Sequence, residues 1–152
     1  MRAVLQIVDD AELLVDNKVI STINKGMVAY FCVEKGDSEE DLHYFAKRFA
    51  QLRIFPDENG KTNLSIKDVN GEILLVSQFT LAGDFKSKLR PDFTKAENYT
   101  RAKEMYEQLY TILTQEHNCT VKLGVFGADM IVKQTGNGPF TAYIEKSNSE
   151  NN

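Results

Sequence analysis

The first quarter of the chain has the hydrophobic pattern of β-strands. Four runs rich in valine, isoleucine, leucine and aromatic residues follow one another, at residues 3–8, 12–15, 18–23 and 27–33. Such side chains favour extended structure because they pack well on a pleated surface. Asp16 and Asn17, between the second and third runs, are typical of a tight hairpin turn. We therefore expect the domain to begin with strands.

Two segments have helical periodicity instead. After a possible cap at Ser38, apolar residues recur at spacings of three and four, at Leu42, Phe45, Ala46, Phe49 and Leu52. A second helix is expected from about Ala96 to His117, with an apolar stripe formed by Ala102, Met105, Tyr106, Leu109, Ile112 and Leu113. Each stripe predicts a helix that buries one face.

Further strands are expected at residues 72–80, 121–125, 130–134 and 141–145, after a turn at residues 57–60. The run at 72–80 is mostly apolar, which indicates a central strand. Strands interrupted by two helices favour the α+β class, here with a largely antiparallel sheet closing into a barrel-like core and two main helices. We expect one domain over residues 1–146 and a polar, frayed tail over residues 147–152.

Composition narrows the class of protein. No apolar run approaches the ~20 residues of a membrane-spanning helix. The chain opens with strand-like residues rather than a signal sequence, so we expect a cytoplasmic protein without a membrane partner. Cys32 and Cys119 have no CxxC partner, which favours buried reduced thiols over a disulfide or redox role. With only His43 and His117, the sequence predicts no metal site and no cofactor.

The formal net charge of −4 argues against a protein that coats nucleic acid through a broad basic face. A smaller basic patch remains compatible with this negative net charge. The candidates cluster after the apolar strand, at Lys86, Lys88, Arg90 and Lys95. The alternative is that these cations belong to an ordinary solvated loop.

Two short segments combine backbone-shaping residues with small polar groups. Residues 77–81, Ser-Gln-Phe-Thr-Leu, end the apolar strand, where a rigid scaffold can hold reactive groups beside an open loop. Residues 136–141, Gly-Asn-Gly-Pro-Phe-Thr, place an X-Pro bond next to glycines that let backbone approach a ligand. Taken singly, the first could be a strand with a polar rim and the second a hairpin turn.

Together these segments resemble a known family. The strings MRAVLQIV, LRIF, SQFTL, Arg90-Pro91, FGADM and GPFT occur here in the order found in D-aminoacyl-tRNA deacylases. The resemblance covers roughly residues 1–145, and several motifs in register are more specific than any one of them. It implies an esterase that removes D-amino acids, and glycine, from the acceptor end of tRNA.

The resemblance also implies a homodimer. Each active site would combine the SQFTL segment of one subunit with a Gly-cis-Pro dipeptide of the other, here Gly138-Pro139. An L side chain would collide with this rigid backbone, whereas a D side chain points away from it and glycine has no side chain that could collide. The dipeptide would therefore act as a chiral filter that needs no contact with the variable group.

Roles for the remaining site residues follow from the same resemblance. The N–H groups of Phe79 and Thr80 are candidates to bind the oxyanion of the tetrahedral intermediate. Thr80 could be a nucleophile, but no base is evident, so we prefer water attack assisted by the 2′-hydroxyl of the RNA, with Thr80 as a positioning group. Ser77 and Gln78 would hold the adenosine, and Lys86 and Arg90 would contact phosphate. Phe79 could stack on a base, but its place at a strand end favours a position in the core.

The chain departs from the family pattern near its C-terminus. Gly136 stands where the family has asparagine, Asn137 fills the variable position and Phe140 replaces valine, while Lys88 and Leu89 replace the usual glycine and arginine. A related class with a trans Gly-Pro and relaxed chirality removes L-alanine from tRNA, and is kept as one alternative. A second alternative is a nucleic-acid-binding module without catalysis, against which the acidic balance counts.

Overall fold

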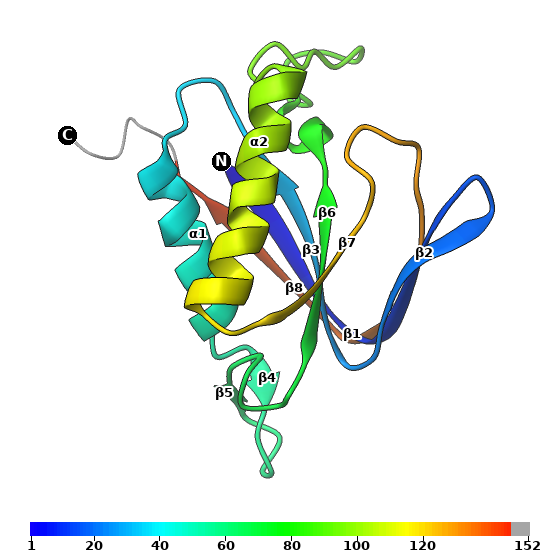
Figure 1. Ribbon diagram of the computed structural model, residues 1–152, viewed down its shortest axis with the longest axis vertical. Helices are drawn as coiled ribbons and strands as arrows, with labels where there is room; N and C mark the ends of the chain where they lie inside the picture. Colours follow the sequence, from blue (N-terminus) through cyan, green and yellow to red (C-terminus); the bar gives the residue numbers. More distant parts are fainter. Residues whose placement is uncertain (147–152) are drawn as a thin grey trace.

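The computed structural model describes residues 1–146, so the expected tail at residues 147–152 lies outside the described part. Its elements follow one another along the chain as shown in Figure 1. They are β1 (Arg2–Val15), β2 (Lys18–Ile23), β3 (Gly26–Cys32), α1 (Glu39–Gln51), β4 (Phe55–Pro56), β5 (Thr62–Leu64), β6 (Glu72–Ser77), a 3-10 turn η1 (Phe79–Ala82), α2 (Tyr99–Thr111), a π-helical turn η2 (Ile112–Glu116), β7 (Thr120–Leu123) and β8 (Ile131–Glu145).

One six-stranded mixed sheet organises the molecule. Its order is β2-β1-β3-β6-β7, and β8 pairs with the other side of β1. The long β1 is antiparallel to β3 in its first half, to β2 in its second half and to β8 along most of its length. The pairs β3–β6 and β6–β7 are parallel, and each needs a crossover connection, which contains α1 in the first pair and α2 in the second. The hydroxyl of Ser21 on β2 donates to the carbonyl of Leu123 on β7 over 2.5 Å, which nearly closes the sheet.

This arrangement confirms the expected α+β class with a barrel-like core and two main helices. Both helices lie on one face of the sheet (Figure 1), and the larger core fills the space between them and the strands. Phe45 and Phe49 of α1 pack edge to face against Phe31 of β3 in this layer. A second, smaller core occupies the inside of the curved sheet around Leu13, Val28 and Leu74. Within residues 1–146, no helix is both long enough and apolar enough to cross a membrane.

Local expectations near the N-terminus are confirmed. Asp16 and Asn17 have φ of 50° and 62°, the left-handed values that a tight β1–β2 hairpin requires. Ser38 caps α1 in a capping box with Asp41, whose carboxylate accepts from the Ser38 backbone N–H over 2.9 Å. The periodicity and the cap therefore place α1 within one or two residues of the prediction.

Other expected boundaries are wrong. The strand predicted to reach Thr80 ends at Ser77, because residues 79–82 form a 3-10 turn in which the Leu81 N–H donates to the Gln78 carbonyl. α2 begins at Tyr99 rather than Ala96, since the Asn98 side chain accepts from the Arg101 N–H and starts the helix there. The two strands predicted at 130–134 and 141–145 are one strand, β8, because β1 is long enough to pair with both parts.

Candidate active site

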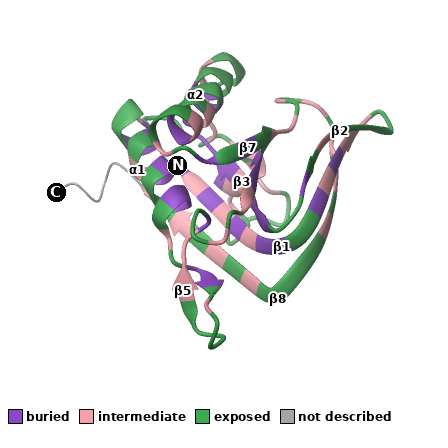
Figure 2. Cartoon of the chain, turned by 60° about the horizontal axis from the view of Figure 1, so that its bottom comes forward, coloured by how far each residue is buried: buried purple, intermediate pink, exposed green. Residues whose placement is uncertain are grey.

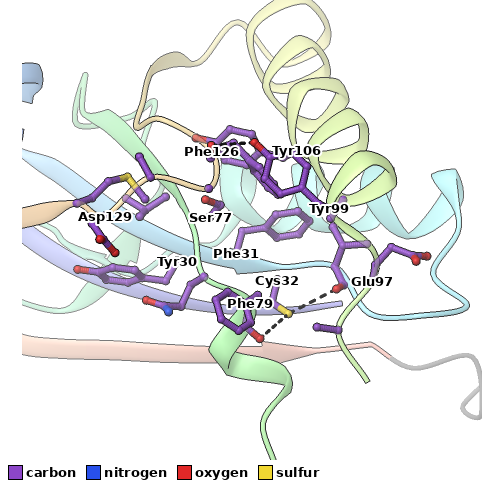
Figure 3. A pocket seen from close by; sticks show the side chains of 18 of the residues that line it. Tyr30, Phe31, Cys32, Ser77, Phe79, Glu97, Tyr99, Tyr106, Phe126 and Asp129 are labelled. Carbon is purple, nitrogen blue, oxygen red and sulfur yellow. Dashed lines mark hydrogen bonds between the residues drawn. The ribbon is translucent and has the colours of Figure 1, made fainter. Parts of the chain in front are cut away.

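A cavity of about 520 Å³ opens beside the end of β6 (Figure 3). Its walls come from five parts of the chain: the end of β3, the end of β6 with the two residues after it, α2 with the residues before it, the loop at residues 126–130, and Val132 of β8. This volume lies within the ~300–1,000 Å³ that is typical of small-molecule sites. The cavity is therefore large enough for a nucleoside with an attached group.

The predicted SQFTL segment lies at this cavity. Ser77, Gln78 and Phe79 line it, whereas Thr80 stands one residue outside the wall. The side-chain amide of Gln78 donates to the Thr80 hydroxyl over 2.5 Å, which ties Thr80 to the wall. Phe79 is 59% exposed, so the expectation that it joins the core is wrong. The turn at residue 78 swings its ring out of the sheet, so that it lies between the cavity and solvent (Figure 3).

The 3-10 turn presents backbone donors as well. Phe79 and Thr80 are the first two residues of the turn, and the first N–H groups of a helix have no acceptor inside it. The side chain of Gln78, at the cap position, does not accept from them. Within residues 1–146, neither N–H group donates to a backbone carbonyl elsewhere, so both can donate to an anionic oxygen that approaches this end of the turn.

Aromatic side chains form the wall opposite this turn. The Phe126 ring lies 5.2 Å from that of Tyr99 and 5.5 Å from that of Tyr106, measured between centroids. The Tyr106 hydroxyl donates to the Leu75 carbonyl over 2.7 Å, and its burial raises its pKa. None of these three residues was predicted to belong to the site, although Phe126 is part of the FGADM motif. Tyr106 was predicted only as a core position of the apolar stripe, and Tyr99 lies outside that stripe.

Cys32 lies at the base of the cavity. Its thiol sulfur is 3.6 Å from the carbonyl oxygen of Phe79, toward which it donates. Burial raises the pKa of Cys32 to about 11, and the nearby carboxylate of Glu34 acts in the same direction. The thiol is therefore protonated at neutral pH and is a poor nucleophile. Both cysteines are buried and free, as expected.

Two carboxylates line the cavity, those of Glu97 and Asp129. Glu97 lines the cavity, but the Asn98 N–H and the Arg101 guanidinium lower its pKa, and Arg101 contacts it at 2.6 Å. His43 faces Glu116 on the outer surface of α1, and His117 ends η2. Among the described residues that line the cavity there is no histidine, and residues 1–146 hold no group of three or more side chains placed to bind a metal ion.

The Gly138-Pro139 dipeptide lies elsewhere, on β8. Its peptide bond is cis, as expected, and it sits in an irregular stretch of the strand opposite Ile7. The five residues 135–139 are all exposed, and none of them lines the cavity of the same chain. Figure 2 shows that β8 is an outer strand without a buried position along its length.

Hydrogen bonds connect this strand to the cavity across the sheet. The Tyr30 hydroxyl, in the cavity wall, donates to the side-chain amide oxygen of Gln134 over 2.8 Å. Gln134 in turn donates to Gln6 over 2.9 Å, and Gln6 donates to the Thr141 hydroxyl over 3.4 Å. A chain of polar side chains thus runs from the cavity to the residue that follows the Gly-Pro-Phe segment.

The basic cluster forms an exposed loop between β6 and α2, which projects at the top of Figure 1. Lys86 and Arg90 are exposed and do not line the cavity. Lys88 is held by Asp92 at 2.7 Å. The structure thus brings three of the expected site residues into one wall, keeps Thr80 beside them, and leaves the dipeptide and the loop cations outside.

Comparison with known proteins agrees on one family. The family model described as D-Tyr-tRNA(Tyr) deacylase matches residues 4–145. The chain is 43% identical over 145 residues to the D-aminoacyl-tRNA deacylase of Magnetococcus marinus, covering 95% of this chain and 96% of that one. It is also 43% identical over 147 residues to the enzyme of the same name from Thermotoga petrophila, covering 97% and 98% of the two chains.

Two solved structures share the fold. One is described as a c-Myc DNA Unwinding Element Binding Protein, with a TM-score of 0.92, 33% identity and coverage of 97% of this chain and 99% of that one. The other, a probable eukaryotic D-amino acid tRNA deacylase, has a TM-score of 0.81 at 18% identity, covering 94% and 97% of the two chains. The second likeness concerns the fold alone.

Proposed function

Because the chain belongs to the D-aminoacyl-tRNA deacylase family, the ester hydrolases of translation proofreading, we propose that its cavity receives the aminoacyl end of D-aminoacyl-tRNA. The observation that carries this proposal is the position of the Ser77–Thr80 segment, which puts polar side chains and two free backbone donors at one rim of the cavity. The aromatic wall around Phe126 suits the flat adenine base. Residues 1–146 would act as one domain, in the cytoplasm where tRNA is charged.

The proposed chemistry is water attack on the ester that joins the amino acid to the terminal adenosine. Attack moves negative charge onto the carbonyl oxygen, and the N–H groups of Phe79 and Thr80 would stabilise it. Neither the protonated Cys32 nor the ion-paired Glu97 is suited to take the proton of the water. Asp129 in the cavity wall and the 2′-hydroxyl of the adenosine remain as candidates, and we assign the 2′-hydroxyl to assist the attack, as the family resemblance implies. Ser77 and Gln78 would hold the nucleoside against the rim.

A second copy of the chain would complete the site. Gly138-Pro139 is exposed and lies outside the cavity of its own chain, so it is available to a partner subunit. In the described part of the chain β8 pairs with β1 alone, and long exposed edge strands are normally covered. We assign the dipeptide to the partner's cavity, where its backbone would exclude an L side chain and admit a D side chain. Glycine would pass the same filter, so glycyl-tRNA mischarged on alanine tRNA is a further expected substrate.

The proposal is tested by deacylation of D-Tyr-tRNA, Gly-tRNA and L-Ala-tRNA side by side. We expect rapid loss of the D-tyrosyl and glycyl esters while the L-alanyl ester survives, and a dimer in sedimentation equilibrium. Cleavage of the L-alanyl ester would assign the chain to the relaxed class instead. A monomeric enzyme that still rejects the L-alanyl ester would contradict a site shared between subunits. If none of the esters is cleaved, the proposed hydrolysis is wrong.

One observation favours testing a second function. A protein of the same fold at 33% identity is described as binding a DNA unwinding element, and this chain also has exposed cations at Lys86 and Arg90. Filter binding to duplex DNA over a range of salt concentrations decides between the two. Tight binding that weakens steeply with salt, without ester hydrolysis, would replace the enzyme by a binding module. DNA binding together with ester hydrolysis would indicate two functions on one fold.

A further inference from the structure

Three phenylalanine rings form a row that leads away from the cavity. Phe79 lines the cavity, and its ring lies 5.3 Å from that of Phe93, which lies 6.2 Å from that of Phe85. Both contacts are edge to face. Phe79 and Phe85 are 59% and 62% exposed, so the ends of the row offer large aromatic surfaces to solvent. We call Phe79, Phe93 and Phe85 the aromatic row.

The backbone under the row is built to hold it. A Cβ atom on Gly83 would lie 2.7 Å from the Phe85 ring and 2.8 Å from the Phe93 ring, so both rings rest directly on the glycine. The ends of the loop are joined by the N–H of Asp84, which donates to the Asp92 carbonyl over 3.1 Å. The Asp84 carboxylate also accepts from the N–H groups of the next turn, including that of Lys86 at 3.0 Å. The rings are thus placed by the fold and not left on a loose loop.

Cations surround the row on a chain that is acidic overall. Residues 83–95 contain four basic residues and two acidic ones, whereas the whole chain carries a net charge of −4. Of the two carboxylates, Asp92 is neutralised by Lys88, and Lys88 and Thr94 hold its pKa well below the usual range. Within the described residues, neither Lys86 nor Arg90 makes an ion pair, and both are exposed. The surface beside the row is therefore locally positive.

We propose that the aromatic row and its cations bind the unpaired nucleotides that precede the terminal adenosine of the tRNA. Exposed aromatic faces beside lysine and arginine are the general means of binding single-stranded nucleic acid, because every base has a face to stack and every nucleotide a phosphate. The row begins at the cavity rim, so a strand whose last nucleoside occupies the cavity would continue over it. This inference rests on the proposed function, since that function places an RNA end in the cavity.

The charge and the exposed rings of this surface match a single-stranded RNA. Each nucleotide of such a strand carries a phosphate for Lys86 or Arg90 and a base that can stack on the exposed rings of Phe79 and Phe85. The row would add affinity for the RNA without contacting the ester. The effect on activity of removing a ring of the aromatic row should therefore depend on the length of the RNA attached to the amino acid.

The test compares two substrates with the same ester. For D-tyrosyl-tRNA, Phe85→Ala should lower kcat/KM by about 10-fold, within the range that removal of one stacking aromatic causes, mainly through KM. For D-tyrosyl-adenosine, which has no second nucleotide, the variant should match the wild type. Phe85→Trp should restore the activity on tRNA. Val19→Ala, which shortens an exposed apolar side chain on β2, is the matched control and should leave kcat/KM unchanged for both substrates.

Two further measurements separate the outcomes. Fluorescence anisotropy with a short single-stranded RNA ending in CCA should show weaker binding to Phe85→Ala, and Lys86→Ala should reduce the salt dependence of binding. If the wild type cleaves neither ester, the proposed function fails while the anisotropy still tests the row. Equal loss on both substrates, unchanged binding of the RNA, or a shift of the variant to a smaller oligomer would each overturn the inference. The last result would identify the row as an interface between copies.

Discussion

The side-chain amide of Gln78 donates a hydrogen bond of 2.5 Å to the hydroxyl oxygen of Thr80. Gln78 thereby uses an acceptor position of that hydroxyl and leaves the Thr80 proton available to donate elsewhere. A nucleophilic hydroxyl needs the opposite arrangement, in which a base accepts its proton. The pair therefore fits a threonine that positions substrate or water.

Replacing Thr80 should reduce activity without abolishing it. Thr80→Ala removes one positioning hydroxyl but keeps both backbone donors of the turn, so we expect a loss of about 10- to 1,000-fold in single-turnover deacylation of D-Tyr-tRNA. Gln78→Ala should also reduce activity, because it removes the hydrogen bond that positions Thr80 and a group that would hold the nucleoside. A loss beyond about 10⁴-fold in a folded Thr80→Ala protein, with a burst in the wild type, would instead indicate a covalent intermediate.

Cys32 should be dispensable for the chemistry. Burial raises its thiol pKa to about 11, so the neutral form predominates at every pH well below that value. We expect Cys32→Ala to keep kcat/KM within about 3-fold, and its profile from pH 6 to pH 9 to run parallel to that of the wild type. Cys119→Ala, at the other buried thiol and outside the cavity wall, is the matched control. Loss of one limb of the profile in Cys32→Ala alone would give the thiol a catalytic role.

The capping box of α1 should make stability depend on pH. Burial alone would raise the pKa of Asp41, but the Ser38 N–H and the Lys146 ammonium lower it below its ordinary value of 3.8. A depressed pKa contributes stability above the unfolded value, and this contribution is lost as the pH falls through the folded value. Asp41→Asn should therefore lower the free energy of unfolding by about 1 kcal/mol at pH 7.

Urea unfolding between pH 3 and pH 7 measures this effect. The difference between Asp41→Asn and the wild type should stay constant down to about pH 5 and narrow below about pH 4. Glu40→Gln, one residue earlier on an exposed face, should stay within about 0.5 kcal/mol of the wild type at neutral pH. A difference for Asp41→Asn that is independent of pH would mean that packing, and not charge, is lost.

Gly26 should be intolerant of any side chain. It pairs with Glu72 where β3 and β6 run parallel, and a Cβ atom would lie 1.8 Å from the Glu72 carbonyl oxygen. Because that neighbour is backbone, the two strands must separate, and we expect Gly26→Ala to lose at least about 3 kcal/mol in urea unfolding. Gly136→Ala is the control, since a Cβ there meets nothing within 4 Å. Comparable stability of the two variants would contradict the strand register.

Several features followed from the sequence because their causes are local. Spacings of three and four with a capping serine predicted α1, and Asp16-Asn17 predicted the first hairpin. The motifs also indicated the family, since each of them is a short string that is recognisable without its neighbours. The end of β6 and the start of α2 were predicted wrongly, because the 3-10 turn at residues 79–82 and the side-chain hydrogen bond of Asn98 decide these boundaries.

Only the tertiary structure decided what forms the site. Tyr30, Tyr99 and Phe126 belong to three separate segments, and only the parallel pairing of β3, β6 and β7 brings them around one cavity. The same pairing leaves Phe79 exposed at the rim and keeps Gly138-Pro139 outside the cavity of its own chain. Hydrophobic periodicity reports which face of an element is buried, but it carries no information about which distant element covers that face. Local sequence therefore determined the elements and the family, and long-range strand pairing determined the cavity.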